Sequence, residues 1–234
     1  AKNEGGTPEG LCDVMYLNCH SYYSLRYGMM SVGQLVHGAI DAKAGAIALT
    51  DINNSTAIPE FAGECIKNGI RPVAGIEFRN GNELQYIGIA RNNKGLRELN
   101  EFLSKINSEK TEIPFPAPGF SESYVIYPLS KRPGRKLSEN ERIGIKPREI
   151  NSLVTFDHSA DRKSMVLLQP VTFSSKDEIF THRSLRAIDN NILLSHLRPS
   201  QCAREDEFFM DPATLRHFRE ENKWITGNTE MLLS

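Results

Sequence analysis

The chain has 234 residues, of which 39% are hydrophobic and 24% charged, and its formal net charge is −1. The length is enough for one large α/β domain or two small ones, and the composition is that of an ordinary globular protein. The near-zero charge gives no sign of a basic nucleic-acid surface or of attraction to a membrane. No window approaches the roughly 20 apolar residues of a membrane span, and no signal sequence opens the chain, so we expect a cytoplasmic protein.

The start of the chain differs from the rest. Residues 1–14 are Gly-rich, polar and aperiodic, and we interpret them as a leader or tag that is disordered. An apolar and aromatic run begins at Met15. We therefore expect the folded domain to span residues 15–234.

Three strands separated by helices are expected in the first third of the chain. Short apolar runs predict buried strands, and helical spacing of apolar residues after Ser31 predicts a capped helix that Gly45 closes. Gly69 ends the second helix. The expected elements are, in order, a strand over 15–20, a helix over 32–44, a strand over 46–51, a helix over 59–68 and a strand over 72–77. This alternation is typical of a parallel sheet with helical crossovers.

The remaining elements are less regular. The turn at 80–82 (Asn-Gly-Asn) predicts a hairpin, so the strand over 84–90 should run antiparallel. Ser175 and Glu178 fit a capping box, and Asp211-Pro212 fits the start of a last helix. The other expected elements are a helix capped by Asn92 or Asn93, strands over 124–129, 143–145 and 165–168, a basic loop over 131–142, a helix over 147–153, a helix after 178 and a helical tail over 215–233.

The first three strands end in polar side chains. His20, Asp51 and Glu77 each stand at or just after the end of a strand. Carboxyl ends of parallel strands meet at one edge of a sheet, which is where ligands bind in α/β proteins. We therefore expect the three residues to share one rim, and any active site to lie there. His37, His182 and His217 fall inside predicted helices, where surface or packing roles are expected.

Several segments together resemble a known family. The segments are 17–28 (LNCHSYYSLRYG), 48–61 (ALTDINNSTAIPEF), 69–78 (GIRPVAGIEF), 86–107 and 208–234. They resemble the polymerase and histidinol phosphatase (PHP) domain, in the branch at the N-terminus of the bacterial DNA polymerase III alpha subunit. The resemblance implies an α/β fold, a distorted, TIM-like (β/α)7 barrel with C-terminal helices. In active members a cleft at the carboxyl ends of the strands holds three zinc or manganese ions that support phosphoester or proofreading hydrolysis.

The metal-ligand pattern of that family is mostly missing here. His20 and Glu77 match ligand positions, and Asp51 stands beside one that has been lost. The departures are Asn18, Tyr27, Ile52, Gln85, Pro170 and Thr172. Two ligands cannot assemble a multinuclear site, and apolar residues remove the donors that offset cation desolvation. We expect a cleft without catalytic residues, with His20 and Glu77 as weak candidates for a single zinc or manganese ion and Asp51 bonded to amides of the following turn.

The resemblance implies a structural role within a longer enzyme. The parent chain would be a DNA-directed DNA polymerase that uses magnesium in a part absent from this fragment. Its implied partners are the rest of the alpha chain, a proofreading exonuclease subunit and, through the parent polymerase, DNA. The alternatives are a metal-dependent PHP phosphoesterase, a 3′–5′ proofreading exonuclease and a nucleic-acid-binding module. The module would use the basic residues Arg132, Arg135, Lys136, Arg142, Lys146 and Arg148.

Overall fold

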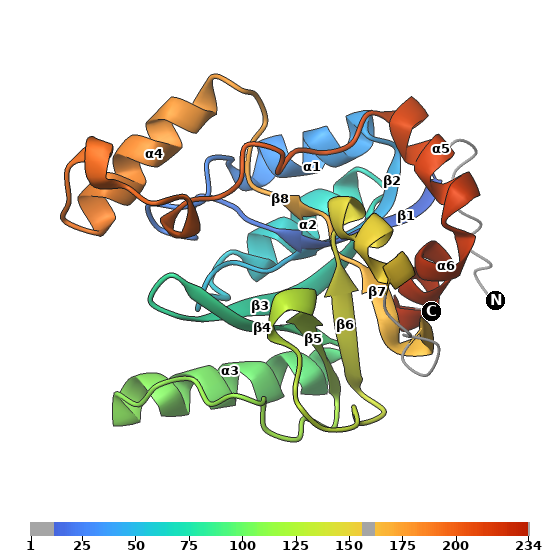
Figure 1. Ribbon diagram of the computed structural model, residues 1–234, viewed down its shortest axis with the longest axis horizontal. Coiled ribbons are helices and arrows are strands. Elements are labelled where there is room, and N and C mark those ends of the chain that lie inside the picture. Colours follow the sequence, from blue (N-terminus) through green and yellow to red (C-terminus); the bar gives the residue numbers. More distant parts are fainter. Residues whose placement is uncertain (1–11, 156–161, 234) are drawn as a thin grey trace.

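A single curved sheet organises the protein (Figure 1). The computed structural model describes residues 12–155 and 162–233. The strands of the sheet are β1 (Cys12–Cys19), β2 (Ala44–Leu49), β3 (Arg71–Asn80), β4 (Glu83–Ala90), β5 (Ser123–Pro128), β6 (Glu141–Ile145), β7 (Met165–Leu167) and β8 (Pro170–Val171). Their spatial order is β7-β6-β5-β4-β3-β2-β1-β8. The expected α/β class with a TIM-like, curved sheet is confirmed, with eight strands among the described residues where the resemblance implied seven.

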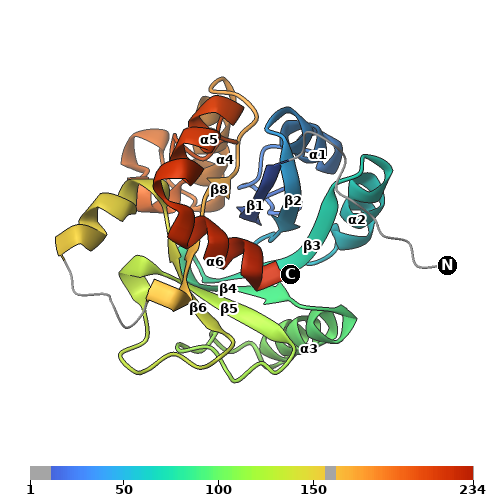
Figure 2. The ribbon, with the colours of Figure 1, turned by 90° about the vertical axis from the view of Figure 1, so that its right-hand side faces the viewer.

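Helices surround this sheet (Figure 2). The α-helices are α1 (Val32–Asp41), α2 (Ile58–Lys67), α3 (Asn93–Glu109), α4 (Glu178–Asp189), α5 (Pro212–Glu221) and α6 (Lys223–Leu233). The 3₁₀ helices are η1 (Leu129–Lys131), η2 (Pro147–Thr155), η3 (Arg162–Ser164), η4 (Leu194–His196) and η5 (Pro199–Gln201). Side chains cap three of the α-helices at the positions expected from the sequence, because Ser31, Asn92 and Asp211 each accept backbone N–H groups of the first turn.

Alternation along the strands divides the core. Tyr16 packs with the buried faces of α1 and α2, whereas Leu17, the next residue of β1, packs with apolar residues from the strands on the other side of the sheet. Successive side chains of a strand point to opposite faces. A third cluster fills the space between β3–β6 and α3, around Phe78 and Tyr86. The sheet therefore has apolar packing on both faces, as expected for strands buried in an α/β protein.

The turn between β3 and β4 reverses the chain as expected. Gly81 has φ of +58°, a conformation that glycine adopts at little cost. β4 therefore runs antiparallel to β3, and β5 runs antiparallel to β4, whereas the other neighbouring strands are parallel. This hairpin presents Asn82 to α4, where the Arg186 guanidinium donates to its side-chain oxygen.

The two ends of the sheet order are close in sequence. Only Leu168 and Gln169 separate β7 from β8, which lie at opposite ends of the order. The two sheet ends are therefore joined by a two-residue link, although β7 and β8 do not pair with each other. Helix α6 packs beside β7, where the Leu167 N–H donates to Thr229 Oγ1 at 2.8 Å and Asn228 Nδ2 donates to the Met165 carbonyl at 2.9 Å.

Several expected boundaries were wrong at the ends of elements. β1 begins at Cys12, three residues before the expected strand, and residues 1–11 of the expected leader lie outside the described residues. Helix α1 ends at Asp41, and the left-handed residue after it is Lys43, with φ of +55°, whereas Gly45 already belongs to β2. The left-handed position for which glycine was expected is therefore occupied by a lysine.

Two features of the C-terminal half also differ from expectation. The side chain that bonds Glu178 belongs to Ser174, not Ser175: its hydroxyl and its backbone N–H both lie 2.7 Å from the Glu178 carboxylate. The helical tail is divided in two at Asn222, whose side chain donates to the Phe218 carbonyl. The short strand β8 was not expected. None of the helices that the structure describes is long and apolar enough to cross a membrane.

Candidate functional site

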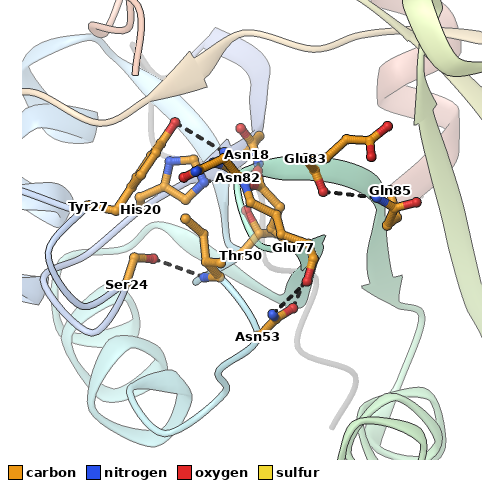
Figure 3. A network of polar contacts seen from close by, with 12 residues as sticks. Asn18, His20, Ser24, Tyr27, Thr50, Asn53, Glu77, Asn82, Glu83 and Gln85 are labelled. Atoms are coloured by element: carbon orange, nitrogen blue, oxygen red, sulfur yellow. Dashed lines mark hydrogen bonds and ion pairs between the residues drawn. The ribbon is translucent and has the colours of Figure 1, made fainter. Parts of the chain in front are cut away.

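The ends of β1, β2 and β3 meet at one rim, and their polar side chains form a buried cluster (Figure 3). Parallel pairing of these strands brings their carboxyl ends together, which is why residues distant in sequence are neighbours here. His20 and Glu77 are in direct contact, at 3.0 Å between Nε2 and Oε2, and both are 1% exposed. Asp51 is at the same rim, but it bonds the turn after β1 rather than these two side chains.

Glu77 is the centre of the cluster and is surrounded by donors. Asn18 Nδ2 donates to Glu77 Oε2 at 2.6 Å, and the Arg79 Nε–H donates to Oε1. Burial would raise the pKa of Glu77, but the charges of Arg79 and His20 outweigh it and hold the pKa well below its usual value. The carboxylate is therefore ionised, and its charge is balanced by side chains of the protein itself.

Arg79 supplies the balancing charge and is held in place from several sides. It lies on the same face of β3 as Glu77, because side chains two residues apart in a strand point the same way. Its Nη2 donates to the Tyr27 hydroxyl at 3.1 Å, and its guanidinium carbon lies 4.4 Å from the centre of the Tyr27 ring. The Asn53 side chain bonds both the N–H and the carbonyl of Arg79 at 2.9 Å. The guanidinium is thus enclosed between a carboxylate and an aromatic ring.

His20 links Glu77 to the segment that follows β8. Its Nδ1 lies 3.0 Å from Thr172 Oγ1, and that hydroxyl lies 2.6 Å from Glu207 Oε2. The Thr172 and Phe173 N–H groups also donate to the Glu207 carbonyl, at 2.9 and 3.1 Å. The Thr172 hydroxyl can donate its single proton to the Glu207 carboxylate and accept from His20. His20 is therefore bonded through both ring nitrogens to other protein side chains.

Asp51 braces the turn between β1 and α1. Its carboxylate accepts the Ser21 N–H at 2.8 Å, the Ser21 hydroxyl at 2.7 Å and the Ser24 hydroxyl at 2.6 Å. We expected Asp51 to accept backbone amides of the turn that follows it, and this was wrong. Its carboxylate oxygens are instead occupied by Ser21 and Ser24, which lie in the loop after β1. Burial raises the pKa of Asp51, although the hydrogen bonds from Ser24 and Ser21 oppose this effect.

Three more residues at metal-ligand positions of the family pattern offer no ligand atom at the rim. Ile52 packs against an apolar cluster formed by Tyr27, Phe173 and Ala203. Pro170 is the first residue of β8 and is buried. Gln85 lies apart from the cluster on β4, where its side chain accepts from Lys131 Nζ at 2.7 Å.

His182 and Arg186 of α4 support the cluster from outside. The Ala203 N–H donates to His182 Nε2 at 2.9 Å, so Nδ1 carries the proton and donates to the Tyr27 carbonyl at 2.8 Å. Burial lowers the pKa of His182 to about 4, although the bond to Tyr27 opposes this. The Arg186 guanidinium lies 5.3 Å from the Tyr27 ring and donates to the Gln201 carbonyl at 2.7 Å. His182 has the packing role expected of it.

The residues present do not fit the metal cluster that the family resemblance implies. Among the described residues, no three His, Cys, Asp or Glu side chains are grouped closely enough to hold a metal ion. The His20 and Glu77 atoms that would face a metal bond each other, and the Arg79 guanidinium already supplies a positive charge beside Glu77. A divalent cation at this point would lie next to a buried cation and would lack the oxygen or nitrogen ligands it requires.

Sequence reasoning missed two members of the cluster. Arg79 carried a signal, because it stands two residues after Glu77 in a predicted strand and must share its face. Glu207 carried none, since it lies in a loop that reaches Thr172 across 35 residues.

The basic residues of the alternative nucleic-acid module are partly neutralised, because Arg135 pairs with Glu141 at 2.7 Å and Arg148 with Asp206 at 3.1 Å.

Comparison with known proteins identifies the family. The family model described as PHP domain matches residues 17–128, which run from the second half of β1 to the end of β5 and include Asn18, His20, Glu77 and Arg79 of the cluster. These residues belong to the PHP domain family. The resemblance seen in the sequence is thereby confirmed.

The relatives of this chain are much longer proteins. The DNA polymerase III subunit alpha of Staphylococcus aureus (strain COL) is 29% identical over 194 residues, which are 77% of this chain and 17% of that protein. The same subunit of Ureaplasma parvum is 33% identical over 94 residues, 40% of this chain and 10% of that protein. A solved two-domain protein from Bacteroides vulgatus, described as containing a predicted PHP-like metal-dependent phosphoesterase, is 13% identical with a TM-score of 0.37, over 60% of this chain and 48% of that one.

Proposed function

We propose that this PHP domain is part of a bacterial DNA polymerase III alpha subunit and serves there as a structural and docking domain without hydrolytic activity of its own. The polymerase relatives support the parent enzyme. In that enzyme nucleotidyl transfer, its magnesium ions and its contacts with DNA belong to the segments that this chain does not match. A replication enzyme of this kind works in the cytoplasm.

The observation that carries the loss of hydrolysis is the bond between Arg79 and Glu77. Hydrolysis by a metal cluster requires open ligands that hold a cation and a bound hydroxide. Glu77 here accepts from Asn18, His20 and Arg79, so its oxygens are directed at protein donors. The Arg79 guanidinium balances the negative charge of the Glu77 carboxylate, so a metal cation is not needed for this. The cleft then acts as a buried connection between β1, β3 and the segment after β8.

Metal content and hydrolysis measured together test this role. We expect elemental analysis of the purified protein to find no zinc or manganese in stoichiometric amount. Adding either ion should leave the melting temperature unchanged, because only a ligand that binds the folded state raises it. No hydrolysis of a phosphodiester such as bis(p-nitrophenyl) phosphate should exceed the buffer rate. Two or more metal ions per chain, or a hydrolytic rate that disappears in the His20→Ala variant, would show that the domain is a metal-dependent phosphoesterase or proofreading nuclease.

Exposed apolar side chains on α4 support the docking part of the proposal. Phe180 is 69% exposed, Ile188 65% and Leu193, just after the helix, 68%. Phe180 and Ile188 are eight residues apart, about two helical turns, and so lie on one side of α4. Figure 1 shows α4 projecting from the sheet. Exposed apolar groups on a projecting helix are typical of protein contacts, and the partner we propose is the polymerase part of the alpha chain.

Hydrogen exchange tests the docking role. The domain should be compared alone and with the polymerase region of an alpha subunit added in trans. We expect slower exchange over α4 and the residues up to Leu193 in the mixture. Protection that appears only when a proofreading exonuclease subunit is added would assign the surface to that protein instead. No change anywhere in either mixture would contradict the docking role.

A further inference from the structure

A cavity lies at the opposite edge of the sheet from the polar cluster. Its volume is about 580 Å³, within the range of small-molecule sites. Arg71, at the start of β3, lines it, while Glu77 stands six residues further along the same strand, about 20 Å away at roughly 3.3 Å per residue. The other walls come from α2, the end of β4, the start of α3, β5 and the end of α6, and Figure 2 shows these helices around the start of β3.

The polar part of the cavity wall is positively charged. Its polar lining residues are Arg71, Arg91, Asn92, Asn93 and Tyr124, and no Asp or Glu is among the described residues that line it. The Arg91 guanidinium carbon lies 5.2 Å from the centre of the Tyr124 ring, and the Arg142 guanidinium carbon lies at the same distance. Two cations therefore share one aromatic ring at the cavity edge.

Neither of these two cations forms an ion pair with a carboxylate of the described residues. Among the ion pairs of the part of the chain that the structure describes, none includes Arg91 or Arg142. Arg142 Nη1 donates instead to the backbone carbonyls of Glu139 and Glu141, at 2.6 and 2.9 Å. Burial lowers the pKa of Arg142, and the nearby charge of Arg91 lowers it further, against the opposing effects of Tyr124 and Glu139. The carboxylate of Glu122 is engaged by Asn92 Nδ2 at 2.8 Å. Like charges held together without an ion-pair partner favour an added anion.

The other walls of the cavity are apolar. Leu96 of α3, which is half-buried, lines it, as does Met231 of α6, which is 68% exposed. A bare inorganic anion would leave these walls in contact with water. A ligand that carries both an anionic group and an apolar or planar body would use the whole cavity, because apolar surface removed from water contributes to binding. Guanidinium groups favour phosphate, whose oxygens accept two parallel N–H bonds.

We propose that this cavity binds a small organic phosphate of nucleotide size, with its phosphate at Arg71 and Arg91 and its planar body against Leu96 and Met231. The assignment is independent of the polymerase role and of the polar cluster at the other edge of the sheet. It gives the domain a ligand site in a part of the fold that its metal-ligand pattern does not include.

Calorimetric titration with deoxyadenosine monophosphate tests the assignment, with deoxyadenosine and inorganic phosphate as partial ligands. We expect saturable binding of the monophosphate, and binding weaker by at least about tenfold for each partial ligand. The Arg91→Gln variant should weaken binding of the monophosphate by about tenfold or more, the loss expected for one charge-assisted contact. Arg97→Gln, an exposed change of equal charge on α3, the helix that follows Arg91, lies outside the cavity. It is the matched control and should leave binding unchanged.

Several results would overturn the proposal. These are no saturable binding of the monophosphate, equal loss in the Arg91→Gln and Arg97→Gln variants, or inorganic phosphate binding as tightly as the monophosphate. If a single-stranded oligonucleotide binds and the monophosphate does not, the proposal is overturned in favour of a nucleic-acid surface. Amide chemical shifts should change at 71–74 and 91–96 when the monophosphate is added. Melting temperatures of both variants show whether they are folded.

Discussion

Arg79 and Glu77 stand two residues apart on one strand and form an ion pair that is almost closed to water, with side-chain exposures of 11% and 1%. This pairing sets the character of the whole rim. Glu77 stays ionised without any ion from solution, and Asn18, His20 and Tyr27 are arranged around the pair. In this chain a side chain of the protein supplies the positive charge beside the glutamate.

Removing the guanidinium should destabilise the fold strongly. Arg79→Met leaves the Glu77 carboxylate buried without its counter-charge, and we expect a loss of roughly 3–5 kcal/mol in the free energy of unfolding. Urea denaturation gives this value. Arg97→Met, an exposed change of the same type, should stay within about 0.5 kcal/mol of the parent. The double variant Arg79→Met with Glu77→Gln should lose less than the two single losses combined, and strict additivity would contradict the coupling.

His182 should make stability depend on pH in the weakly acidic range. Its folded pKa is about 4, below the usual value of 6.5, so the unfolded chain takes up a proton first as pH falls. Stability is therefore fully present above about pH 6.5 and declines as pH falls toward about 4. Between about pH 7 and about pH 5 the loss should be about 2 kcal/mol.

Unfolding measured at both pH values checks this effect, and the variants identify its source. His182→Gln removes the titrating group, so the difference between the two pH values should shrink by most of that amount even if the variant is less stable at both. His37→Gln, at an exposed position on α1, should keep the full difference. A pH difference that survives in the His182→Gln variant would assign the effect to another group.

Asp51 should matter as a hydrogen-bond acceptor more than as a charge. Asp51→Ala leaves the Ser21 N–H and two serine hydroxyls without their acceptor, at a cost of about 1–3 kcal/mol for a buried group. Asp51→Asn keeps one acceptor oxygen. Because burial already raises the pKa of Asp51, the neutral amide should cost clearly less than alanine in urea denaturation. Equal losses in the two variants would mean that the negative charge itself is required.

Gly28 should tolerate no side chain. A Cβ at this position would lie 1.8 Å from the Ser21 carbonyl oxygen, so the turn that carries Ser21 would have to move. We expect Gly28→Ala to lower the free energy of unfolding by about 1–3 kcal/mol. Gly33, on α1, has nothing within 4 Å of the added Cβ, and Gly33→Ala should instead stabilise the helix by about 0.5–1 kcal/mol. Thermal and urea unfolding of the two variants should therefore change in opposite directions.

The sequence was sufficient to predict the rim because the signals there are local. His20 and Glu77 each follow an apolar run, and the geometry of a parallel sheet then places them together. The hairpin at Gly81 and the caps at Ser31, Asn92 and Asp211 were predictable for the same reason, since each depends on the conformation of a few adjacent residues.

The partners that complete the rim could not be predicted in this way. Glu207 reaches Thr172 from an irregular loop, and His182 meets Tyr27 across 155 residues, so neither contact leaves a periodic pattern in the sequence. The left-handed backbone at Lys43 shows that a residue preference can also predict the wrong position for a helix end. Glycine is preferred there but is not required, and tertiary packing decides.

The packing of α6 beside β7 has a consequence for the behaviour of the protein at high concentration. Edge strands with free N–H and C=O groups recruit other chains and promote aggregation. Here the Leu167 N–H donates to Thr229, and the Met165 carbonyl accepts from Asn228, so α6 covers the edge of β7. A chain shortened before α6 would expose that edge. We expect the shortened chain to self-associate before the hydrogen bonds of the polar cluster are lost.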